Sequence, residues 1–484
     1  GLNAEQLRAV ETTAGPLLVL AGAGSGKTRV LTSRIAYLIG VCGIPDSGLL
    51  AVTFTNKAAG EMKERVEKLL GPQASGLAIG TFHSICVRIL RREIGHLGRS
   101  RGFVIYDDAD SLGVIKQALK REGLDPKAHD PKRIRWRIDQ WKNAGILPAQ
   151  AIESAYDIDD ELSARFYGIY QRMLLDANAL DFGDLILQTA ELFRQFPRVL
   201  EFYQRRWQYV LVDEFQDTSY TQLKLLELLT AGWEQSDGRT LFLVGDPMQS
   251  IYRFRNADMS LFLNTKLRGI GEIRCESLTL ERNFRSRPKI IKWINKTFSQ
   301  VFPEQDDPKS GEAKFNPCKW TRKHSNDEGV EVHALRGSDP TAEVQRVADI
   351  LIKERANSPT RSIAILVQSR SHLNGLTEQL RPLDLPIRAI EITAPNQHQV
   401  VQDLIGLTRA LTHRAERIAW LGVLRAPWCG LSWQDLHSLC ADDRQSPIWA
   451  LMNDDERVGR LSREGRERLI SVRGVLQLAF QTRS

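Results

Sequence analysis

The chain has 484 residues, too many for one hydrophobic core, and its 42% hydrophobic and 26% charged residues are ordinary for a globular protein with several domains. No run approaches the roughly 20 apolar residues of a membrane helix, and the first residues carry no apolar signal region, so we expect a cytoplasmic protein. The net charge of +7 does not indicate nucleic acid by itself, and the six cysteines form no CxxC pair that would suggest zinc or thiol-redox chemistry.

Short apolar runs without strict alternation punctuate the chain, and most are followed by helix-like patterns. Runs of this length predict strands buried on both faces of a parallel sheet, and strands that alternate with helices predict an α/β fold. The runs are LLVLA (17–21), LLAVTFT (49–55), YVLVDE (209–214), LFLVGD (241–246), VEVHAL (330–335) and SIAILVQS (362–369).

Helical segments interrupt this pattern twice. Between about 107 and 177 the runs disappear and the sequence is helix-like and polar, which predicts a helical insertion in the first α/β domain. The stretch 302–329 is rich in Pro, Gly and charge, as surface connections are. A second α/β unit is expected after it, and from 399 onward the pattern is helical again.

A phosphate-binding loop follows the first apolar run. The segment AGAGSGKT (21–28) lies between that run and a stretch with helical spacing, which is the context that such a loop requires. Backbone N–H groups and the helix N-terminus would hold the phosphates, Lys27 would reach the β- and γ-phosphates, and Thr28 would bind Mg²⁺. The residues expected to bind the nucleotide here are Gly22, Ala23, Gly24, Ser25, Gly26, Lys27, Thr28 and Arg29.

A carboxylate pair decides between the many proteins that contain such a loop. The segment VLVDEFQDT (210–218) places Asp213 and Glu214 at the end of another apolar run. Asp213 would enter the coordination shell of Mg²⁺, and Glu214 would polarise the attacking water. Such a pair can also cap a helix, but its position after an apolar strand favours chemistry. The loop alone would fit a kinase, a GTPase or a transporter subunit, and the second motif decides against most of these in favour of a hydrolase of a nucleoside triphosphate.

Two segments concentrate basic residues. Residues 88–101 hold five arginines against one glutamate, and residues 132–142 interleave five basic residues with Trp136 and Trp141. Basic groups follow a phosphate backbone and indoles stack on bases, so both segments suit nucleic acid. A solvated helix face whose tryptophans belong to the core is an equally good interpretation of the second segment.

These motifs resemble those of the superfamily 1A DNA helicases, the UvrD/Rep/PcrA group, with the third motif leaning toward their RecB-type helicase–nuclease relatives. The resemblance covers residues 1–290 densely and 291–484 more weakly. Its further segments, in the order of the family, are LNAEQLRAV (2–10), AVTFTNKAAGEMKERV (51–66), GTFHSICVRIL (80–90), LDFGDLI (180–186), VGDPMQSIYRFRNAD (244–258) and LERNFRS (280–286).

The resemblance implies two RecA-like P-loop domains with parallel sheets, 1A and 2A, each interrupted by a mainly helical insertion, 1B and 2B. ATP would lie between 1A and 2A, and single-stranded DNA would cross both during translocation from 3′ to 5′. The implied boundaries are 1–106 and 178–277 for 1A, 107–177 for 1B, 278–398 for the first part of 2A, and 399–484 for an incomplete 2B.

The family also implies roles for single residues around ATP and DNA. Gln6 would read the adenine edge, Phe284 would stack on the adenine, Gln249 would contact the γ-phosphate or the attacking water, and Arg285 would act as an arginine finger from the second domain. Core packing remains an alternative for Phe54, and a core or capping role for His83. The expected DNA contacts are Phe54, Asn56, Lys57, His83, Arg88, Phe182, Tyr252 and Phe254, together with the basic cluster 132–142.

Two motifs of the family are missing, since no HxxKGLE-like and no YVAxTRA-like segment occurs in the chain. We therefore expect an N-terminal portion of a longer protein. The leading hypothesis is a 3′–5′ DNA helicase that uses ATP and Mg²⁺, acts on single-stranded and 3′-tailed duplex DNA near the nucleoid, and works with repair or recombination proteins. The alternatives are an ATP- and DNA-binding module with little turnover, and the motor part of a helicase–nuclease.

Overall fold

The computed structural model contains two compact units, Gly1–Val332 and His333–Ser484. Within the part of the chain that it describes, no helix combines the length and the apolar character needed to cross a bilayer. The described residues are 1–74, 76–234, 237–252, 257–321, 329–335, 340–373, 376, 380, 399–412, 414, 416–443 and 446–481.

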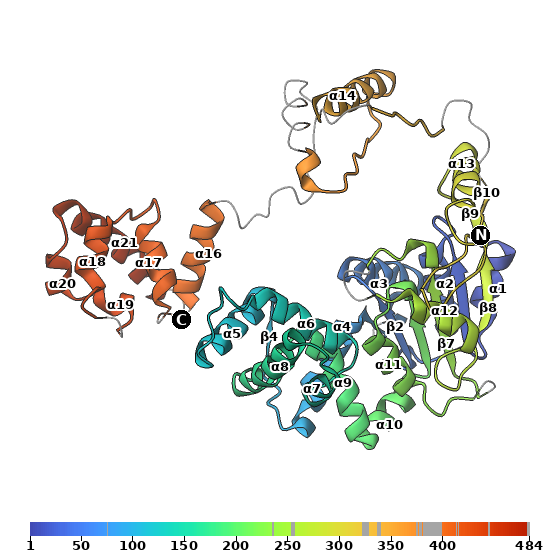
Figure 1. The fold of residues 1–484 in the computed structure, drawn as a ribbon, viewed down its shortest axis with the longest axis horizontal. Helices are drawn as coiled ribbons and strands as arrows, with labels where there is room; N and C mark the ends of the chain where they lie inside the picture. The colour runs from blue at the N-terminus through green and yellow to red at the C-terminus, as the bar shows by residue number, and fades with distance from the viewer. Residues whose placement is uncertain are drawn as a thin grey trace. The chain divides into compact units, whose positions relative to one another are not determined.

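The first unit is built on a parallel β-sheet (Figure 1). Among the described residues, six strands form this sheet in the order β3-β2-β6-β7-β1-β8, and every pairing between neighbours is parallel. This confirms the predicted α/β fold, and the first four apolar runs all form strands. The bounds are β1 (Leu17–Ala21), β2 (Leu49–Thr53), β3 (Ala78–Thr81), β6 (Tyr209–Val212), β7 (Thr240–Gly245) and β8 (Glu276–Leu280).

Side chains of the strands alternate between two buried faces, which explains why the runs are apolar throughout. Leu17 and Phe242 pack on one face, while their neighbours Leu18 and Leu243 pack on the other. The first face is covered by α1 (Ala4–Glu11), α2 (Lys27–Gly40) and α3 (Asn56–Leu70). The second is covered by α4 (Phe82–Glu93), α9 (Phe182–Gln195), α11 (Tyr220–Leu229) and α12 (Met259–Arg268), with α10 (Pro197–Arg206) beside α9.

The segment after the sheet packs with the first unit rather than with the second. The expected boundary between 277 and 278 falls inside β8, which pairs with β1 along its whole length. A small parallel pair of β9 (Arg282–Asn283) and β10 (Lys319–Trp320) follows, with α13 (Pro288–Phe298) between its strands. Residues 278–332 therefore lie in the same compact unit as the phosphate-binding loop.

A helical insertion lies between two short parallel strands of the first unit. The sequence places this insertion at 107–177, and its helices span residues 108 to 176. Their shared core contains Trp141, Tyr167 and Tyr170. Asp130 caps the second helix through the N–H of Lys132. The elements are β4 (Val104–Tyr106), α5 (Asp108–Arg121), α6 (Pro131–Asn143), α7 (Pro148–Ser154), α8 (Ile158–Asp176) and β5 (Ala179–Asp181).

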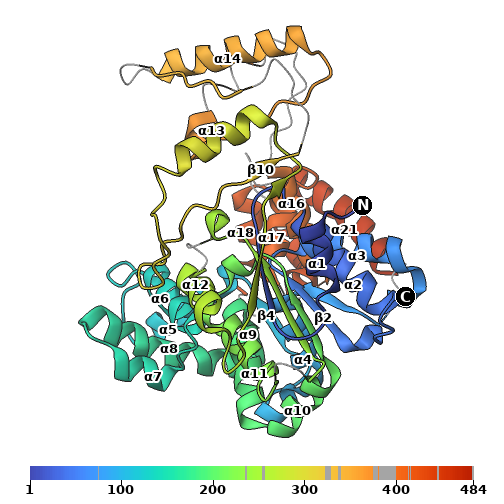
Figure 2. The same cartoon turned by 90° about the vertical axis from the view of Figure 1, so that its right-hand side faces the viewer.

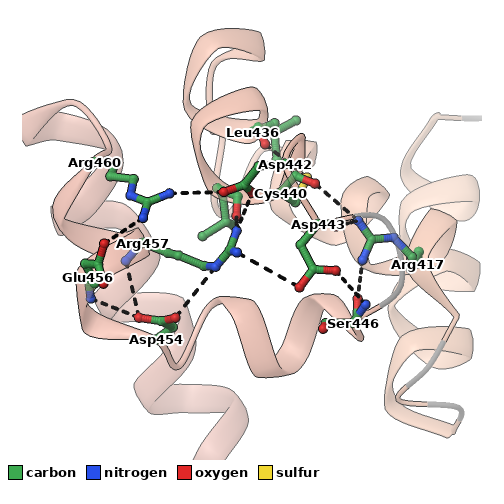
Figure 3. A network of polar contacts seen from close by, with 11 residues as sticks. Arg417, Leu436, Cys440, Asp442, Asp443, Ser446, Asp454, Glu456, Arg457 and Arg460 are labelled. Carbon is green, nitrogen blue, oxygen red and sulfur yellow. Dashed lines mark hydrogen bonds and ion pairs between the residues drawn. The ribbon is translucent and has the colours of Figure 1, made fainter.

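The regular elements described in the second unit are helices, and a helical cluster toward its end packs around the buried Trp420. A polar network supports this cluster: Arg457 pairs with Asp442 at 2.5 Å, and Arg417 donates to the carbonyl oxygen of Asp443 at 2.9 Å (Figure 3). The helices are α14 (Pro340–Asn357), α16 (Gln399–Thr412), α17 (Arg417–Arg425), α18 (Trp433–Cys440), α19 (Ile448–Leu451), α20 (Asp455–Gly459) and α21 (Arg463–Gln481).

Two predicted strands are not formed. The runs 330–335 and 362–369 lie in described residues, yet neither pairs with another strand there. Their apolar side chains are exposed, with Val332 at 80% and Leu366 at 94% of full accessibility. A strand of this composition is stable only between neighbours that cover its backbone groups and both faces, and the described residues supply none. The prediction of strands at these two positions is therefore wrong for this structure.

Candidate nucleotide and nucleic-acid site

The glycine-rich loop joins β1 to α2 in the predicted strand–loop–helix arrangement. Gly26 stands just before α2 with φ of 89°, and Gly24 has φ of 73°; both are left-handed conformations that glycine adopts without strain. A Cβ atom on Gly24 would lie 2.7 Å from Cβ of Arg285. The loop thus requires glycine both for its path and for the close approach of the neighbouring chain, and it leaves the N-terminus of α2 open to anions.

Gln6 lies against the loop backbone. Its Nε2 donates to the carbonyl oxygen of Ser25 at 2.8 Å, and its Oε1 accepts from the N–H of Asn3 at 3.1 Å, so both ends of the amide bond to protein. A Cβ on Gly26 would lie 2.8 Å from Gln6 Nε2. Gln6 therefore supports the loop in this structure, and its reading of adenine stays a prediction.

Lys27 and Glu214 form an ion pair at the edge where the strands end. Lys27 Nζ lies 2.5 Å from Glu214 Oε2, and the two side chains are 12% and 33% exposed. Glu214 has φ of 51°, a conformation that costs a non-glycine residue about 1–3 kcal/mol and is found mainly at functional sites. The structure thus brings together the two residues that the sequence predicts for phosphate binding and for water activation.

Carboxylates outnumber cations around this pair. Burial, and next the charge of Glu214, raise the pKa of Asp213 to about 6 and that of Asp217 to about 7. Burial also raises the pKa of Asp246. Lys27 opposes the shift in all three groups. The site therefore crowds three acidic side chains around Glu214 and Lys27, and this crowding adds to burial in raising their pKa values.

These residues fit a nucleotide polyphosphate with a divalent cation. The buried hydroxyl of Ser25, inside the loop, has no hydrogen-bond partner among the described residues. Asp213 follows β6 and Thr28 lies in the first turn of α2, so one carboxylate and one hydroxyl are available to Mg²⁺. Within the described chain no cluster of three or more His, Cys, Asp or Glu residues could hold a metal ion by itself.

A chain of hydrogen bonds leads from Glu214 to Gln249. Gln216 Nε2 donates to Glu214 Oε2 at 2.8 Å and to Asp217 Oδ2 at 3.2 Å, while its Oε1 accepts from the N–H of Asp246 at 2.9 Å. The amide of Gln249 donates to Oδ2 of the side chain of Asp246, whose backbone N–H donates to Gln216. Gln216 is not among the residues predicted for the site, although its place between two acids of the DEFQD segment is a usable signal.

Asn283 joins the loop to the segment that carries Phe284 and Arg285. Its Nδ2 donates to the carbonyl oxygen of Ala23 at 2.7 Å, and its Oδ1 accepts from the N–H groups of Arg285 and Ser286 at 2.9 and 2.8 Å. The N–H of Phe284 donates to the carbonyl oxygen of Gly24 at 2.8 Å. Arg285 is exposed beside the loop, within the same compact unit. The sequence analysis missed Asn283, which no local pattern marks.

Aromatic side chains gather in two pairs beyond the ends of the strands. The rings of Phe54 and Tyr252 lie 4.8 Å apart, and those of His83 and Phe182 meet edge to face at 5.9 Å. Phe182 is 53% exposed, so its ring is available for stacking. Burial lowers the pKa of His83, which keeps its imidazole neutral at pH 7. Asn56 and Lys57 are exposed at the start of α3, directly after Phe54.

The basic cluster 132–142 is mostly paired inside the insertion. Lys142 is fully buried and lies 2.6 Å from Asp181 and 2.8 Å from Asp184, and Trp141 is 3% exposed. Arg133, Arg135 and Arg137 pair with Asp159, Asp108 and Asp160. The prediction that this cluster follows phosphates is wrong for Lys142 and Trp141, because their charge and ring area are used within the protein. Asp181 also caps α9, so Lys142 fixes the helix that begins with Phe182.

Arg88 and Phe254 are also among the predicted DNA contacts. Arg88 lies at the end of the second turn of α4, and its guanidinium donates to the carbonyl oxygen of Ile79 at 2.9 Å, away from the strand ends where the aromatic pairs gather. Phe254 lies outside the described residues.

The parallel sheet, the loop between β1 and α2, the lysine at the start of α2 and the acidic pair after β6 define a P-loop nucleotide-binding protein. Comparison with protein families is more specific. The UvrD/REP helicase N-terminal domain family matches residues 2–268, and the UvrD-like helicase C-terminal domain family matches residues 278–455. The chain belongs to the UvrD/REP helicase family, which confirms the resemblance seen in its motifs.

The chain is also similar to individual members of this family. The chain is 38% identical over 443 residues to the ATP-dependent DNA helicase PcrA of Bacillus subtilis, covering 91% of this chain and 57% of that protein. It is 37% identical over 431 residues to PcrA of Staphylococcus aureus strain Mu50, covering 89% of this chain and 56% of the relative. The chain thus spans a little over half the length of these curated relatives.

Proposed function

We propose that the protein is a DNA-stimulated ATPase that moves along single-stranded DNA from 3′ to 5′ and unwinds 3′-tailed duplexes. Membership of the UvrD/REP helicase family supports the class of activity, and the relatives named PcrA are ATP-dependent DNA helicases. The direction, a role in repair or recombination, a second RecA-like domain 2A and the insertion 2B are carried over from the family. The implied boundaries 1–106, 107–177, 178–277, 278–398 and 399–484 belong to the same proposal.

One arrangement carries this proposal. Hydrogen bonds run without a break from Glu214 through Gln216 and Asp246 to Gln249. Gln249 stands three residues before Tyr252, whose ring lies 4.8 Å from that of Phe54. A change at the γ-phosphate would therefore move a backbone segment that ends in a base-stacking ring. This is the coupling between hydrolysis and DNA that a motor needs.

Each residue of the site has a defined task in this mechanism. When ATP binds, Lys27 gives up its ion pair with Glu214 and pairs with the β- and γ-phosphates. The Glu214 carboxylate is then free to orient and polarise the attacking water. Mg²⁺, held by Thr28 and Asp213, would neutralise charge that develops on the phosphates. Arg285 adds a second positive charge from the segment anchored by Asn283.

Contacts to the base and to DNA complete the proposal. Phe284 stacks on adenine, and Gln6 supports the loop from the other side while its amide edge reads the base. Bases of single-stranded DNA stack on Phe54, Tyr252, Phe182 and His83, each worth about 1–3 kcal/mol and without preference for sequence. Asn56 and Lys57 contact the backbone beside them.

ATP turnover by this chain, measured with and without single-stranded DNA, tests the proposal. DNA should stimulate hydrolysis, and Lys27→Ala should lower it by about 100-fold or more, since one preorganised charge at a reacting group contributes that much. Lys309→Ala, at an exposed lysine outside the site, is the control and should change little. Undiminished ATP turnover in Lys27→Ala would overturn the proposal that the protein is an ATP-driven motor. Binding of ATP and DNA without turnover by the unmodified chain would favour the alternative of a binding module.

A further inference from the structure

A group of arginines lies at the opposite edge of the sheet from the nucleotide site. It comprises Arg88 and Arg92 on α4 and three residues of α10, and we call it the α4–α10 face. Arg92 lies over the ring of Phe202 at 4.9 Å, which places the end of α4 against α10, and Figure 2 shows the two helices together below the sheet. The residues of α10 in this face are Arg198, Arg205 and Arg206.

The face surrounds a shallow depression of about 600 Å³ lined by Ser47, Glu201, Phe202 and the three arginines of α10. Ser47 stands shortly before β2, and Gln208, shortly before β6, donates to the carbonyl oxygen of Gly48 at 3.1 Å. The depression therefore opens at the amino ends of β2 and β6. Phe54 and Asp213 follow the carboxyl ends of the same strands, and five residues of strand separate the two edges by about 16 Å.

Positive charge in this face is only partly balanced. Glu93 pairs with Arg92 at 3.1 Å, and Glu201 pairs with Arg205 at 3.8 Å. In contrast, Arg88, Arg198 and Arg206 have no carboxylate within ion-pair distance in the described part of the chain, and all three are exposed. Burial, and next the charge of Arg206, lower the pKa of Arg88. The arginines of α10 themselves line one depression.

Like charges held close together without a counter-charge are costly, and a polyanion would remove that cost. All the cations of the face are arginines, whose planar forks bind phosphate oxygens in pairs. An acidic protein segment would supply carboxylates to the same forks, but DNA already engages the other edge of the same compact unit under the proposed function. The helix α10 carries Arg198 near its start and Arg205 and Arg206 at its end, about 10–12 Å apart along the helix axis, so that one continuous phosphate backbone can reach both ends.

We propose that the α4–α10 face binds the phosphate backbone of a second stretch of DNA, separate from the strand that crosses the nucleotide edge. Only the choice of DNA as the polyanion rests on the proposed function. The face would hold either the unwound strand that leaves the motor or duplex DNA that lies ahead, and both present the same phosphodiester chemistry.

Binding of fluorescein-labelled oligonucleotides to the full chain, measured by anisotropy between 50 and 300 mM NaCl, tests this proposal with a single-stranded 30-mer and a blunt 30-bp duplex. The variant Arg198→Gln/Arg206→Gln removes two unpaired charges. The slope of log K against log salt is negative, and each lost phosphate contact makes it shallower by about 0.7 for single strands and about 0.9 for duplex. If the face holds single-stranded DNA, the slope measured with the 30-mer should become shallower by about 1.4; if it holds duplex, the slope measured with the 30-bp duplex should become shallower by about 1.8. The DNA whose slope changes identifies the form that is bound.

Two controls separate charge at this face from other effects. Arg198→Lys/Arg206→Lys keeps both charges and should keep most of the slope. Arg268→Gln/Arg463→Gln removes two exposed arginines elsewhere and should leave the slope unchanged. An unchanged slope in Arg198→Gln/Arg206→Gln with both DNAs would overturn the proposal, as would an equal loss in the lysine variant. Because the readout is binding without ATP, loss of hydrolysis in Lys27→Ala leaves this result unaffected.

Discussion

The side-chain amide of Asn283 donates a hydrogen bond to the carbonyl oxygen of Ala23 at 2.7 Å, and so ties the glycine-rich loop to a segment 260 residues away. Replacing this amide in Asn283→Ala removes that bond and two bonds from the N–H groups of Arg285 and Ser286. Each of the three is worth about 0.5–1.5 kcal/mol net, so the free energy of unfolding should fall by roughly 1.5–4.5 kcal/mol. Affinity for ATP, measured with a fluorescent analogue, should weaken about tenfold, or ~1.4 kcal/mol.

Asn295 provides a matched control for this variant. Its side chain makes two hydrogen bonds to backbone, one fewer than that of Asn283: it donates to the carbonyl oxygen of Cys318 at 2.9 Å and accepts from the N–H of the same residue at 3.2 Å. Asn295→Ala should therefore lower stability by a similar amount and leave ATP affinity unchanged. Equal losses of ATP affinity in the two variants would mean that Asn283 acts only through stability.

Glu214→Gln separates binding from hydrolysis. The variant keeps the shape of the side chain and removes the charge that pairs with Lys27 at 2.5 Å, so Lys27 becomes freer to bind phosphate. We expect ATP affinity to stay equal or rise, while the hydrolysis step slows by about 10²–10⁴-fold, the usual contribution of a general base. Single-turnover hydrolysis and equilibrium binding measure the two effects. Loss of ATP binding in this variant would show that Glu214 serves to hold the loop.

The nucleotide site could be predicted from the sequence because its signals are local. The loop at 21–28 and the pair Asp213–Glu214 each lie within a few residues of an apolar strand, and the order of strand, loop and helix fixes their place at one edge of the sheet. The role of Asn283 could not be predicted, since its partner lies far away in the chain and no local pattern names it. Residues 330–335 failed as a strand for a related reason: an apolar run shows what needs burial and not whether neighbours are present.

Lys142 shows a second limit of local patterns. Its segment alternates basic residues with tryptophans, as a nucleic-acid contact would, yet its ammonium group lies between Asp181 and Asp184 with no exposed surface. Composition alone does not distinguish a lysine that faces solvent from one that pairs with acids 39 residues away. The sequence does contain one signal for this pairing. Asp181 and Asp184 stand close together at the start of a helix, and two buried acids without a counter-charge are costly, so they require a cation nearby.

Removing this buried cation should be strongly destabilising. Lys142→Met leaves Asp181 and Asp184 buried without a counter-charge, which costs about 3–5 kcal/mol in comparable sites. Because Asp181 caps α9, the start of that helix should also loosen, and affinity for single-stranded DNA should fall through Phe182. Thermal unfolding and DNA binding measure the two effects. Arg135→Met on the same helix is the control: its partner Asp108 is 86% exposed, so it should cost less than about 1 kcal/mol.

A neutralised triple variant sharpens this test. Lys142→Met/Asp181→Asn/Asp184→Asn removes all three charges together and should regain part of the lost stability, because no buried charge is then unpaired. Stability in the triple variant below that of Lys142→Met would contradict the explanation by unpaired charge.

Asp139, on the same helix, makes a prediction about pH. Burial, and next the charge of Asp181, raise its pKa from 3.8 to about 6. Above pH 6 the folded protein holds this carboxyl ionised at a cost that the unfolded chain avoids. As the pH falls from 6 toward 4, the folded state takes up a proton that the unfolded state does not, so this group's contribution to stability rises. Asp139→Asn should therefore be more stable than the unmodified protein at pH 7.5, by roughly 1–3 kcal/mol, and the difference should vanish near pH 4.

Glu161→Gln, at an exposed carboxyl of α8, should change stability by less than about 0.5 kcal/mol when thermal unfolding is compared at the same pH. A less stable Asp139→Asn at pH 7.5 would mean that attraction to Arg135 and Lys142 outweighs the cost of burial.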